Sequence, residues 1–440
     1  MGIFSIRRTC KILAVFLVGI IIAIWHPYRK MLPSSSLKQL AVQPNDGPKA
    51  YYGVGKGYHL ILVQLESFQN FLLDQSVEGQ PLTPVLNTLK SESLYFPQLF
   101  QQIGRGNTSD AEFTANTSIY PAGAVPMSSK YGNRKLPSLA RLLHKQGYIA
   151  DTFHVNEASF WDRNQMYPAL GFDTYYDQPY FRKEKFNRFG ASDEELYRVG
   201  FEKLTALAKQ NQKFYAQFVT VSSHSPYTIP EDRKRLKLNG PLHGKTLGDY
   251  LTAVHYADYA LGTFIGKLKQ TGLWDNCVFV VYGDHFGLNK KKYNPQKISD
   301  ALNIPYHKHI STFNVPLLIH LPGQHSGRAI GQTGGQIDIL PTIANIMGLD
   351  LKEEGFTAFG QDLVNAGHNV VGMRYYLPAG SFFNDKVLFI PGKKGFEDGK
   401  ATLIRTHQRV QDITPYKADY DLIMDRLKRS DSYVEHLPLR

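Results

Sequence analysis

The sequence predicts an α/β protein with a central, mostly parallel sheet that is covered by helices on both faces. From Gly57 onward, short apolar runs alternate with longer amphipathic runs, which is typical of strands that alternate with helices. The short runs are apolar almost throughout, and this indicates strands that are buried on both faces. A chain of 440 residues with 42% apolar residues is long enough for two to three domains and a large core.

Five apolar runs are the expected strands of this sheet. They are Leu60–Leu65, Tyr148–Phe153, Phe214–Val221, Val278–Tyr282 and Val315–His320. Four longer runs are the expected helices, and they cover Pro84–Ser93, Pro137–Gln146, Asp193–Gln210 and Tyr250–Gln270. In the last run the apolar residues recur with a period of 3.6, which marks one buried helix face.

The C-terminal part of the chain has a different pattern of apolar and polar residues. After about Leu351 the sequence becomes alternating and turn-rich, and it ends in a charged helical run over Asp421–Lys428. We therefore expect residues 351–440 to form a small α+β subdomain, an antiparallel sheet plus a helix, beside a main domain over residues 58–350.

The N-terminal residues 1–30 are predicted to be a membrane anchor or signal segment. An apolar run from Ile12 to Trp25 lies between basic flanks, but it is shorter than the roughly 17–25 residues that cross a bilayer. A cleaved signal peptide would also fit this length, although no small-x-small site follows Trp25. A buried helix is disfavoured by the basic flanks and by the Pro-, Ser- and Gly-rich linker over residues 31–57. We expect an uncleaved anchor that is extended by snorkelling Lys11 and Arg29.

The charge of the chain does not indicate a nucleic-acid partner. The formal net charge is +12, from 50 Lys and Arg against 38 Asp and Glu, and half of this surplus lies in residues 1–50. The remaining chain is only mildly basic, so the clustered charge fits contact with anionic lipid head groups better. The two cysteines, Cys10 and Cys277, exclude a disulfide framework and a cysteine zinc site.

Three of the predicted strands end directly on polar residues. These ends are Glu66-Ser67, Ser222-Ser223-His224 and Gly283-Asp284-His285. Each end taken alone would be read as a helix cap or a loop hydrogen bond. Because the carboxyl ends of strands in an open α/β sheet form the ligand crevice, the three ends together predict a functional site.

Two of these ends carry residues that suit a divalent cation. Carboxylates such as Glu66 and Asp284 favour Mg²⁺ or Mn²⁺, and the single imidazole of His285 shifts the preference toward Mn²⁺ or Zn²⁺. A site for zinc alone would have further histidine or cysteine ligands.

A hydroxyl group follows the flexible run Gly104–Gly106. Thr108 or Ser109 reads first as the N-cap of a helix that begins here. The same position favours an incoming phosphate, because helix N-termini carry free N–H groups and positive partial charge. If an ion held by Glu66, Asp284 and His285 also contacted Thr108, the alcohol would deprotonate readily and become a nucleophile.

The chain resembles the lipoteichoic acid synthases, which are sulfatase-fold phosphoglycerol transferases of the alkaline phosphatase superfamily. The segments that carry the resemblance are Lys56–Phe71, Gly106–Phe113, Ser159–Arg163, Ser222–Tyr227 and Tyr282–Gly287. The resemblance implies a sulfatase-like fold, with residues 58–350 as a catalytic domain outside the bacterial membrane.

The resemblance also implies a reaction and its partners. Thr108 matches the family's nucleophile, and Glu66, Thr108, Asp284 and His285 match its site for one Mn²⁺ or Mg²⁺ ion. The family moves glycerol phosphate from phosphatidylglycerol to this threonine, releases diacylglycerol, and then transfers the group to a glycolipid or lipoteichoic acid acceptor. The expected partners are these lipids and the membrane, with no nucleic acid. The expected state is a monomer at the cell membrane, held by one N-terminal segment or released after cleavage.

Three residues match positions that hold the glycerol phosphate head group in the family: Trp161, Arg163 and His224. His224 is also the candidate acid for the departing oxygen and the candidate base for the incoming one. From the residues alone, Trp161 could instead belong to the core, Arg163 to a surface ion pair and His224 to a loop.

The chain departs from the family pattern in two ways. Asn156 stands where better-known members carry an acidic residue at the head group, and one short apolar segment replaces several membrane spans. Addition of a single unit therefore remains open beside polymerisation. Other reactions of the superfamily also remain open: a phosphodiesterase, a phosphoethanolamine transferase or a sulfatase-like hydrolase. The surroundings of Thr108 lack the Cys/Ser-x-Pro-x-Arg pattern that sulfatases normally require, and the complete ligand set argues against a binding protein without catalytic activity.

Overall fold

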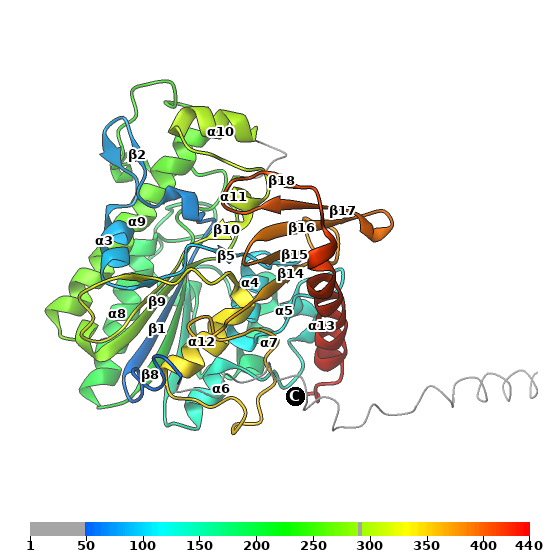
Figure 1. The fold of residues 1–440 in the computed structure, drawn as a ribbon. Coiled ribbons are helices and arrows are strands. Elements are labelled where there is room, and N and C mark those ends of the chain that lie inside the picture. Colours follow the sequence, from blue (N-terminus) through cyan, green and yellow to red (C-terminus); the bar gives the residue numbers. More distant parts are fainter. Residues whose placement is uncertain (1–48, 289–292) are drawn as a thin grey trace, which may run out of the picture. The chain divides into compact units, whose positions relative to one another are not determined.

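An eight-stranded sheet forms the centre of the structure, a computed structural model that describes residues 49–288 and 293–440 (Figure 1). The predicted segment over residues 1–30 and most of the predicted linker lie outside the described residues. The strands are, in spatial order, β12 (Arg328–Ala329), β4 (Leu94–Tyr95), β11 (Leu317–His320), β9 (Cys277–Gly283), β1 (His59–Leu65), β8 (Phe214–Val219), β6 (Ile149–His154) and β7 (Thr174–Tyr176).

The sheet is mostly parallel, as predicted. The five strands β9, β1, β8, β6 and β7 run parallel to one another, and β11 pairs antiparallel with both β9 and β4. The predicted strand over Val315–His320 is divided at Pro316, which has no N–H to donate to a ladder. Its first part, β10 (Asn314–Val315), belongs to a separate small sheet with β5 (Leu99–Phe100) and β13 (Gly334–Gly335).

Alternate residues of the central strands enter two different cores. Leu60 and Leu62 of β1 belong to one apolar cluster, and Ile61 and Val63 belong to the other. This division follows from the two-residue period of a strand, which points successive side chains to opposite faces. Figure 1 shows the helices that cover the two faces: α3 (Pro84–Ser91), α8 (Asp193–Lys209) and α9 (Thr246–Gln270) on one, and α4 (Thr108–Thr117) and α12 (Ile339–Ile346) on the other.

The predicted helices form, with ends that local contacts set. Ser192 caps α8 by accepting a hydrogen bond from the N–H of Glu195, and Ser138 caps α6 (Leu139–His144) in the same way. The helix α9 begins at Thr246, earlier than predicted. The shorter helices are α5 (Met127–Tyr131), α7 (Arg163–Leu170), α10 (Pro295–Leu302) and α11 (Ile310–Phe313), and a small hairpin is made by β2 (Ser76–Val77) and β3 (Gln80–Pro81).

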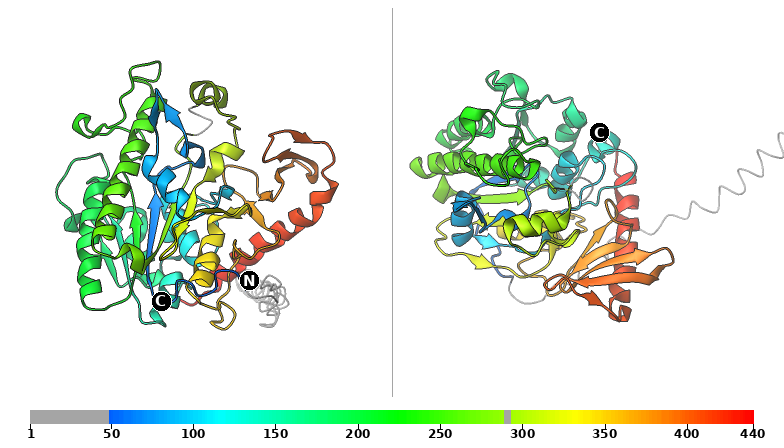
Figure 2. Two further views of the ribbon diagram at one scale, coloured as in Figure 1. Left: turned by 60° about the vertical axis from the view of Figure 1, so that its left-hand side comes forward. Right: turned by 90° about the horizontal axis from the view of Figure 1, so that it is seen from above.

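A five-stranded antiparallel sheet and a helix form the C-terminal part, as predicted. The strands are β14 (Val370–Met373), β15 (Ser381–Asn384), β16 (Val387–Gly392), β17 (Gly395–Leu403) and β18 (Arg409–Val410). The helix α13 (Lys417–Glu435) is longer than predicted, and both views in Figure 2 show it beside this sheet. Ile423 and Leu427 are buried in the apolar cluster that also contains Phe382 of β15. The exact domain boundaries remain predictions.

Residues 49–57, the described end of the predicted linker, pack against the end of α12. The N–H groups of Gly53 and Gly55 donate to the carbonyl groups of Asn345 and Ile346. Gly55 has no room for a side chain, because a Cβ there would lie 2.6 Å from Val278 Cγ2. Across residues 49–288 and 293–440, no helix combines the length and the apolar composition needed to cross a membrane.

Candidate active site

The neighbouring strands β1 and β9 bring three candidate metal ligands together. Leu65 pairs with Gly283 in the parallel register, so the residues that follow these strands, Glu66 and Asp284, emerge side by side. The candidate ligand atoms of Glu66, Asp284 and His285 all lie within 4.8 Å of one another. The sheet edge thus brings together residues that are far apart in the sequence, as the strand ends predicted.

Thr108 completes this cluster from the start of α4. Its hydroxyl donates to Glu66 Oε2 over 3.1 Å and lies 3.4 Å from His285 Nε2. The interpretation of Thr108 or Ser109 as the N-cap is wrong. The N-cap residue is Asn107, whose side chain makes no capping hydrogen bond, and the hydroxyl of Ser109 bonds back to the carbonyl of Gly106.

The loop before α4 is held in a tight conformation by Asp110. The carboxylate of Asp110 accepts hydrogen bonds from the N–H groups of Gly104 and Gly106. A Cβ at Gly106 would lie 2.5 Å from Asp110 Oδ1, so this close approach requires glycine. Asn107 has a φ of 43°, which lets the chain turn and present Thr108 to the cluster.

The donor set of the cluster fits a divalent cation. The N–H at Nδ1 of His285 donates to the carbonyl of Phe286, which leaves the lone pair of Nε2 facing Asp284 Oδ2 across 3.5 Å. Asp284 Oδ2 is buried and has no hydrogen-bond partner. Because buried polar atoms are normally paired, two acceptors that face each other here indicate a place for a cation.

The protonation states of the cluster residues also favour a bound cation. Burial raises the pKa of Asp284 well above its usual range, and the nearby Glu66 raises it further. Burial also opposes the ionisation of Glu66, but the histidines 285 and 224 and its hydrogen bonds lower its pKa overall. Burial lowers the pKa of His285 and keeps the imidazole neutral, as a metal ligand must be. A divalent cation would compensate both carboxylates at once.

The cluster lies on a cavity of about 1190 Å³ that also collects the other predicted site residues. Its lining includes Glu66, Thr108, Asn156, Trp161, Arg163, His224 and His285. The structure thus brings together all the residues that the sequence indicated, with Asp284 buried directly behind the lining.

The structure contradicts the two alternative interpretations, in which Arg163 belongs to a surface ion pair and Trp161 belongs to the core. Arg163 is only 1% exposed, and its guanidinium donates to the buried carboxylate of Glu112, so the ion pair is in the interior and not on the surface. Burial alone would lower the pKa of Arg163, but the charge of Glu112 raises it, and the guanidinium stays charged. Trp161 is partly exposed at a φ of 60° and does not belong to the core.

His224 is half-buried and has one ring nitrogen in use. Its Nδ1 donates to the carbonyl of Ser225 over 2.7 Å, and this leaves Nε2 for a ligand or a proton. The imidazole also contacts the ring of Phe189, with centroids 4.0 Å apart. Asn156 follows β6 on the same cavity, and its Oδ1 accepts a hydrogen bond from the N–H of Glu157.

Comparison with known proteins fits this geometry. Residues 59–349 match the family model described as Sulfatase. The structure is similar to the crystal structure of the lipoteichoic acid synthase LtaP from Listeria monocytogenes, with 40% identity, a TM-score of 0.86, and coverage of 92% of this chain and 98% of that chain. The chain belongs to the lipoteichoic acid synthase branch of the sulfatase family.

Two further matches define the extent of this similarity. The chain is 34% identical over 363 residues to the lipoteichoic acid synthase of Staphylococcus aureus strain USA300, and the match covers 81% of this chain and 54% of that protein. The chain thus spans about half the length of the curated relatives that it matches. A Vibrio parahaemolyticus protein of the alkaline phosphatase superfamily, 23% identical with a TM-score of 0.70, covers 91% of this chain and 95% of that one and has the same fold. The predicted sulfatase-like fold is confirmed.

Sequence reasoning missed one histidine of this sulfatase-family cavity. His154 is the last residue of β6, lines the cavity, and bonds through Nδ1 to the carbonyl of Val219. Burial, together with the charge of Arg163, lowers the pKa of His154 to about 3, so its ring is neutral. The signal was available, because His154 directly follows the predicted strand that ends at Phe153, as the other polar residues follow theirs.

Proposed function

We propose that the chain is a metal-dependent phosphoglycerol transferase that uses Thr108 as its nucleophile. It transfers glycerol phosphate from phosphatidylglycerol to a glycolipid or lipoteichoic acid acceptor and releases diacylglycerol. The observation that carries this proposal is the position of the Thr108 hydroxyl, which lies between Glu66 and His285 at the cavity surface. A hydroxyl at a cation site is the arrangement that an alcohol nucleophile needs.

The residues that would hold one Mn²⁺ or Mg²⁺ ion are Glu66, Thr108, Asp284 and His285. Such an ion, when bound, supplies Lewis-acid chemistry that makes the threonine hydroxyl easier to deprotonate and offsets charge on the phosphate oxygens. The orphaned Oδ2 of Asp284 supports this ligand set.

In the first step, Thr108 Oγ1 forms a bond to phosphorus and the bond from phosphorus to the diacylglycerol oxygen breaks. The hydroxyl proton passes to Glu66 Oε2, its hydrogen-bond acceptor. The departing oxygen takes a proton from Nε2 of His224, whose ring enters this step protonated at both nitrogens, and diacylglycerol leaves. Glycerol phosphate remains as an ester on Thr108.

In the second step, an acceptor hydroxyl gives its proton to Nε2 of His224 and its oxygen bonds to phosphorus. The bond from phosphorus to Thr108 Oγ1 breaks, and Thr108 Oγ1 takes back the proton that Glu66 Oε2 accepted in the first step. Two displacements at one phosphorus let the lipid product leave before the acceptor enters.

Arg163, Trp161 and Asn156 are proposed to hold the glycerol phosphate head group. Arg163 is suited to a phosphate because its pairing with Glu112 fixes the guanidinium rigidly on the cavity wall. Asn156 offers the glycerol hydroxyls a neutral amide. We further propose a monomer at the cell membrane with its catalytic unit outside, held by residues 1–30, with no nucleic-acid partner.

The experiment incubates purified protein with Mn²⁺ and labelled phosphatidylglycerol. We expect release of diacylglycerol and a glycerophosphate adduct on Thr108, detected by mass spectrometry. Thr108→Ala should lose both products, and the matched control Ser109→Ala, which removes the neighbouring hydroxyl, should keep both. Diacylglycerol release that persists in Thr108→Ala would contradict the mechanism. An adduct that yields only free glycerol phosphate, even with an acceptor present, would mean hydrolysis in place of transfer.

A further inference from the structure

A buried amide lies in the central strand β1, within a run that is otherwise apolar. Gln64 is fully buried, and the other residues of the run from Leu60 to Leu65 are all apolar. An amide that is buried in this way destabilises the fold unless its polar atoms are hydrogen-bonded. The partners of Gln64 therefore indicate what the amide does in this strand.

The amide of Gln64 joins β1 to the first residue of α4. Its Nε2 donates to the main-chain carbonyl of Thr108 over 3.1 Å. Because a carbonyl oxygen only accepts hydrogen bonds, the nitrogen of the amide is the end that faces it. Gln64 thus contacts the residue that carries the proposed nucleophile, although Gln64 itself does not line the cavity of the site.

The other end of this amide is held by a tyrosine of the neighbouring strand β9. Tyr282 lies directly beside Gln64 in the parallel register of β1 and β9. The hydroxyl of Tyr282 donates to Oε1 of Gln64, and the tyrosine side chain is also fully buried. This bond fixes the orientation of the amide, so that Nε2 stays directed at Thr108.

The same two strands lead into the carboxylates of the candidate metal site. Gln64 precedes Glu66 by two residues, and Tyr282 precedes Asp284 by two residues. Side chains two residues apart in a strand point to the same face, and Tyr282 shares the apolar cluster on this face with Phe113 of α4. The amide and the phenol thus link the start of α4 to both strands that carry the metal ligands.

The start of α4 depends on such contacts because it lacks an ordinary cap. Asn107, the N-cap residue, makes no side-chain capping hydrogen bond. The carboxylate of Asp110 holds the loop before the helix, and Gln64 holds the first helical residue, Thr108, from the side of the sheet. The position of the Thr108 hydroxyl beside Glu66 therefore depends on an amide that bonds to the backbone of Thr108 and not to its hydroxyl.

We propose that Gln64 and Tyr282 are positioning residues of the transfer reaction. The hydroxyl of Tyr282 orients the amide of Gln64, and this amide keeps Thr108 where its hydroxyl attacks phosphorus. Neither residue lines the cavity, so neither touches the substrate. A nucleophile that is displaced by about 1 Å reacts up to about 100-fold more slowly, so these two hydrogen bonds act on the rate of the chemical step and not on lipid binding. The inference rests on the proposed function, because it assigns both residues to the first step of that reaction.

The test measures formation of the Thr108 adduct in a single turnover, with the full chain, Mn²⁺ and labelled phosphatidylglycerol in neutral detergent micelles. Gln64→Met keeps the volume but removes the amide, and we expect the adduct rate at saturating lipid to fall by about 30- to 100-fold. Tyr282→Phe removes only the hydroxyl, and the rate should fall by about tenfold. The lipid concentration that gives half of the maximal rate should change less than about twofold in both variants, because the head-group contacts remain.

A double variant tests whether Tyr282 acts through Gln64. If it does, Gln64→Met combined with Tyr282→Phe should be about as slow as Gln64→Met alone. Rate losses that multiply in the double variant would refute this order of action.

The response to Mn²⁺ tests whether the metal ligands stay in place. The rise in Tm on addition of Mn²⁺ should be the same in each single variant as in the wild type. Loss of this rise would mean that the amide supports the metal ligands in place of the nucleophile, and it would overturn the inference. If Gln64→Met does not fold, Tyr282→Phe, which removes a single oxygen atom, decides by the same two measurements.

The matched control is Tyr215→Phe. Tyr215 is also fully buried, and its hydroxyl donates to Oδ1 of Asn116 over 2.7 Å, at the far end of the same helix α4. Loss of this bond should leave the adduct rate within about twofold of the wild type. Equal losses of rate in Tyr215→Phe and Tyr282→Phe would mean that any loosening of α4 slows the reaction, and they would overturn the inference.

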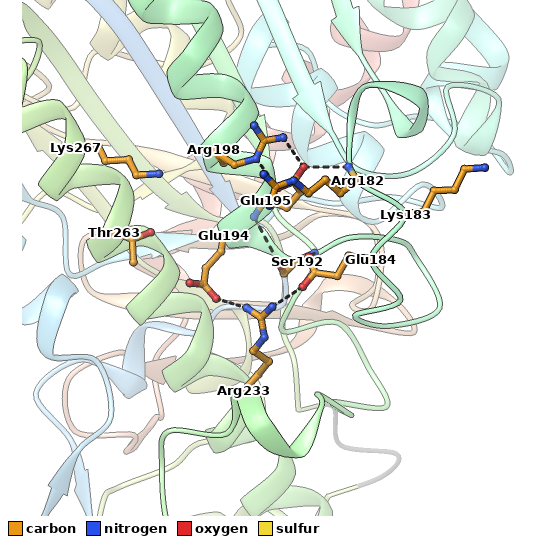
Figure 3. A pocket seen from close by; sticks show the side chains of 10 residues that line it. All are labelled: Arg182, Lys183, Glu184, Ser192, Glu194, Glu195, Arg198, Arg233, Thr263 and Lys267. Carbon is orange, nitrogen blue, oxygen red and sulfur yellow. Dashed lines mark hydrogen bonds and ion pairs between the residues drawn. The ribbon is translucent and has the colours of Figure 1, made fainter.

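A second control lies outside α4. Tyr256 of α9 is buried, and its hydroxyl donates to Oε2 of Glu194 over 2.6 Å, where Glu194 pairs with Arg233 (Figure 3). Tyr256→Phe should keep the wild-type adduct rate. A loss equal to that of Tyr282→Phe would mean that removal of any buried hydroxyl slows the reaction, and it would refute the positioning role.

Two outcomes separate this inference from the proposed function. Wild-type protein that forms no Thr108 adduct would refute the proposed transfer together with the positioning role. An adduct that forms in the wild type, and at the same rate in Gln64→Met, would refute the positioning role alone.

Discussion

The hydroxyl of Thr108 lies 3.1 Å from Oε2 of Glu66, although Thr108 begins the helix α4 and Glu66 follows the strand β1, more than 40 residues earlier in the sequence. The same carboxylate group lies 3.6 Å from His285 Nε2 through its other oxygen. A nucleophile, a carboxylate and a neutral imidazole thus share one small volume. Both the stability and the reactivity of the chain should therefore depend on whether a cation is bound in this volume.

Cation binding should stabilise the fold through this cluster. At about 100 times its Kd, Mn²⁺ is expected to add about 2.7 kcal/mol to the free energy of unfolding. We expect Asp284→Asn to remove this gain, because it removes the carboxylate whose Oδ2 has no other partner. Thermal unfolding with Mn²⁺ and with a chelator measures the gain. Asp275→Asn, which changes an exposed carboxylate outside the cluster, should keep it. An unchanged response in Asp284→Asn would exclude this ligand.

The buried pair of Arg163 and Glu112 should be costly to break. Arg163→Met leaves the Glu112 carboxylate in the interior without its cation, and we expect a loss of about 3–5 kcal/mol in the free energy of unfolding. Arg163→Lys keeps the charge but loses the planar fork, so its loss should be smaller. Denaturant titration measures each loss. The double variant Arg163→Met with Glu112→Leu should be more stable than Arg163→Met alone, and the opposite order would contradict the argument.

Two helix glycines should respond in opposite directions to alanine. A Cβ at Gly200 in α8 would lie 2.1 Å from Phe218 Cε1 of β8, so Gly200→Ala should lower the free energy of unfolding by about 1–3 kcal/mol. Gly266 in α9 has no neighbouring atom within 4 Å of such a Cβ, and Gly266→Ala should raise it by about 0.5–1 kcal/mol. Denaturant unfolding of both variants makes the comparison. Equal effects of the two changes would rule out the close packing of α8 on β8 as the cause.

The contacts of His368 with two carboxylates should make the stability that the C-terminal helix α13 contributes weakly dependent on pH. His368 bonds through its two ring nitrogens to Asp385 and to Asp419 of α13. Partial burial opposes the charge of His368, but the two carboxylates raise its pKa above the usual 6.5. The stabilisation is therefore complete below about pH 6.5 and is lost as the pH rises through the higher pKa of the folded state.

The size of this effect is small because the His368 side chain is 54% exposed. Relative to the wild type, His368→Gln should lower the Tm by about 1–2 °C at pH 6 and by less at pH 9. The control His436→Gln removes an exposed histidine at the end of α13 and should show no such pH dependence. Scanning calorimetry at pH 6 and pH 9 measures the Tm difference between His368→Gln and the wild type. A Tm difference that is larger at pH 9 than at pH 6 would contradict the predicted direction.

The sequence by itself determined the class of the fold and most of the site. Almost continuously apolar runs such as Leu60–Leu65 favour burial on both faces, and this predicts a parallel sheet between helix layers. Polar residues at the ends of these runs, such as Glu66 and Asp284, predict a site because all parallel strands end at one edge. His154 followed the same rule and could have been found with it.

The tertiary structure alone decided how these residues act. No local pattern shows that Thr108 is the first residue of α4 and not its cap, because Asp110 and the glycines before it set that turn. No pattern gives Arg163 its buried partner Glu112 or places the ring of Phe189 against His224. Such contacts join residues from separate elements, and their energies depend on burial and distance, which only the folded chain defines.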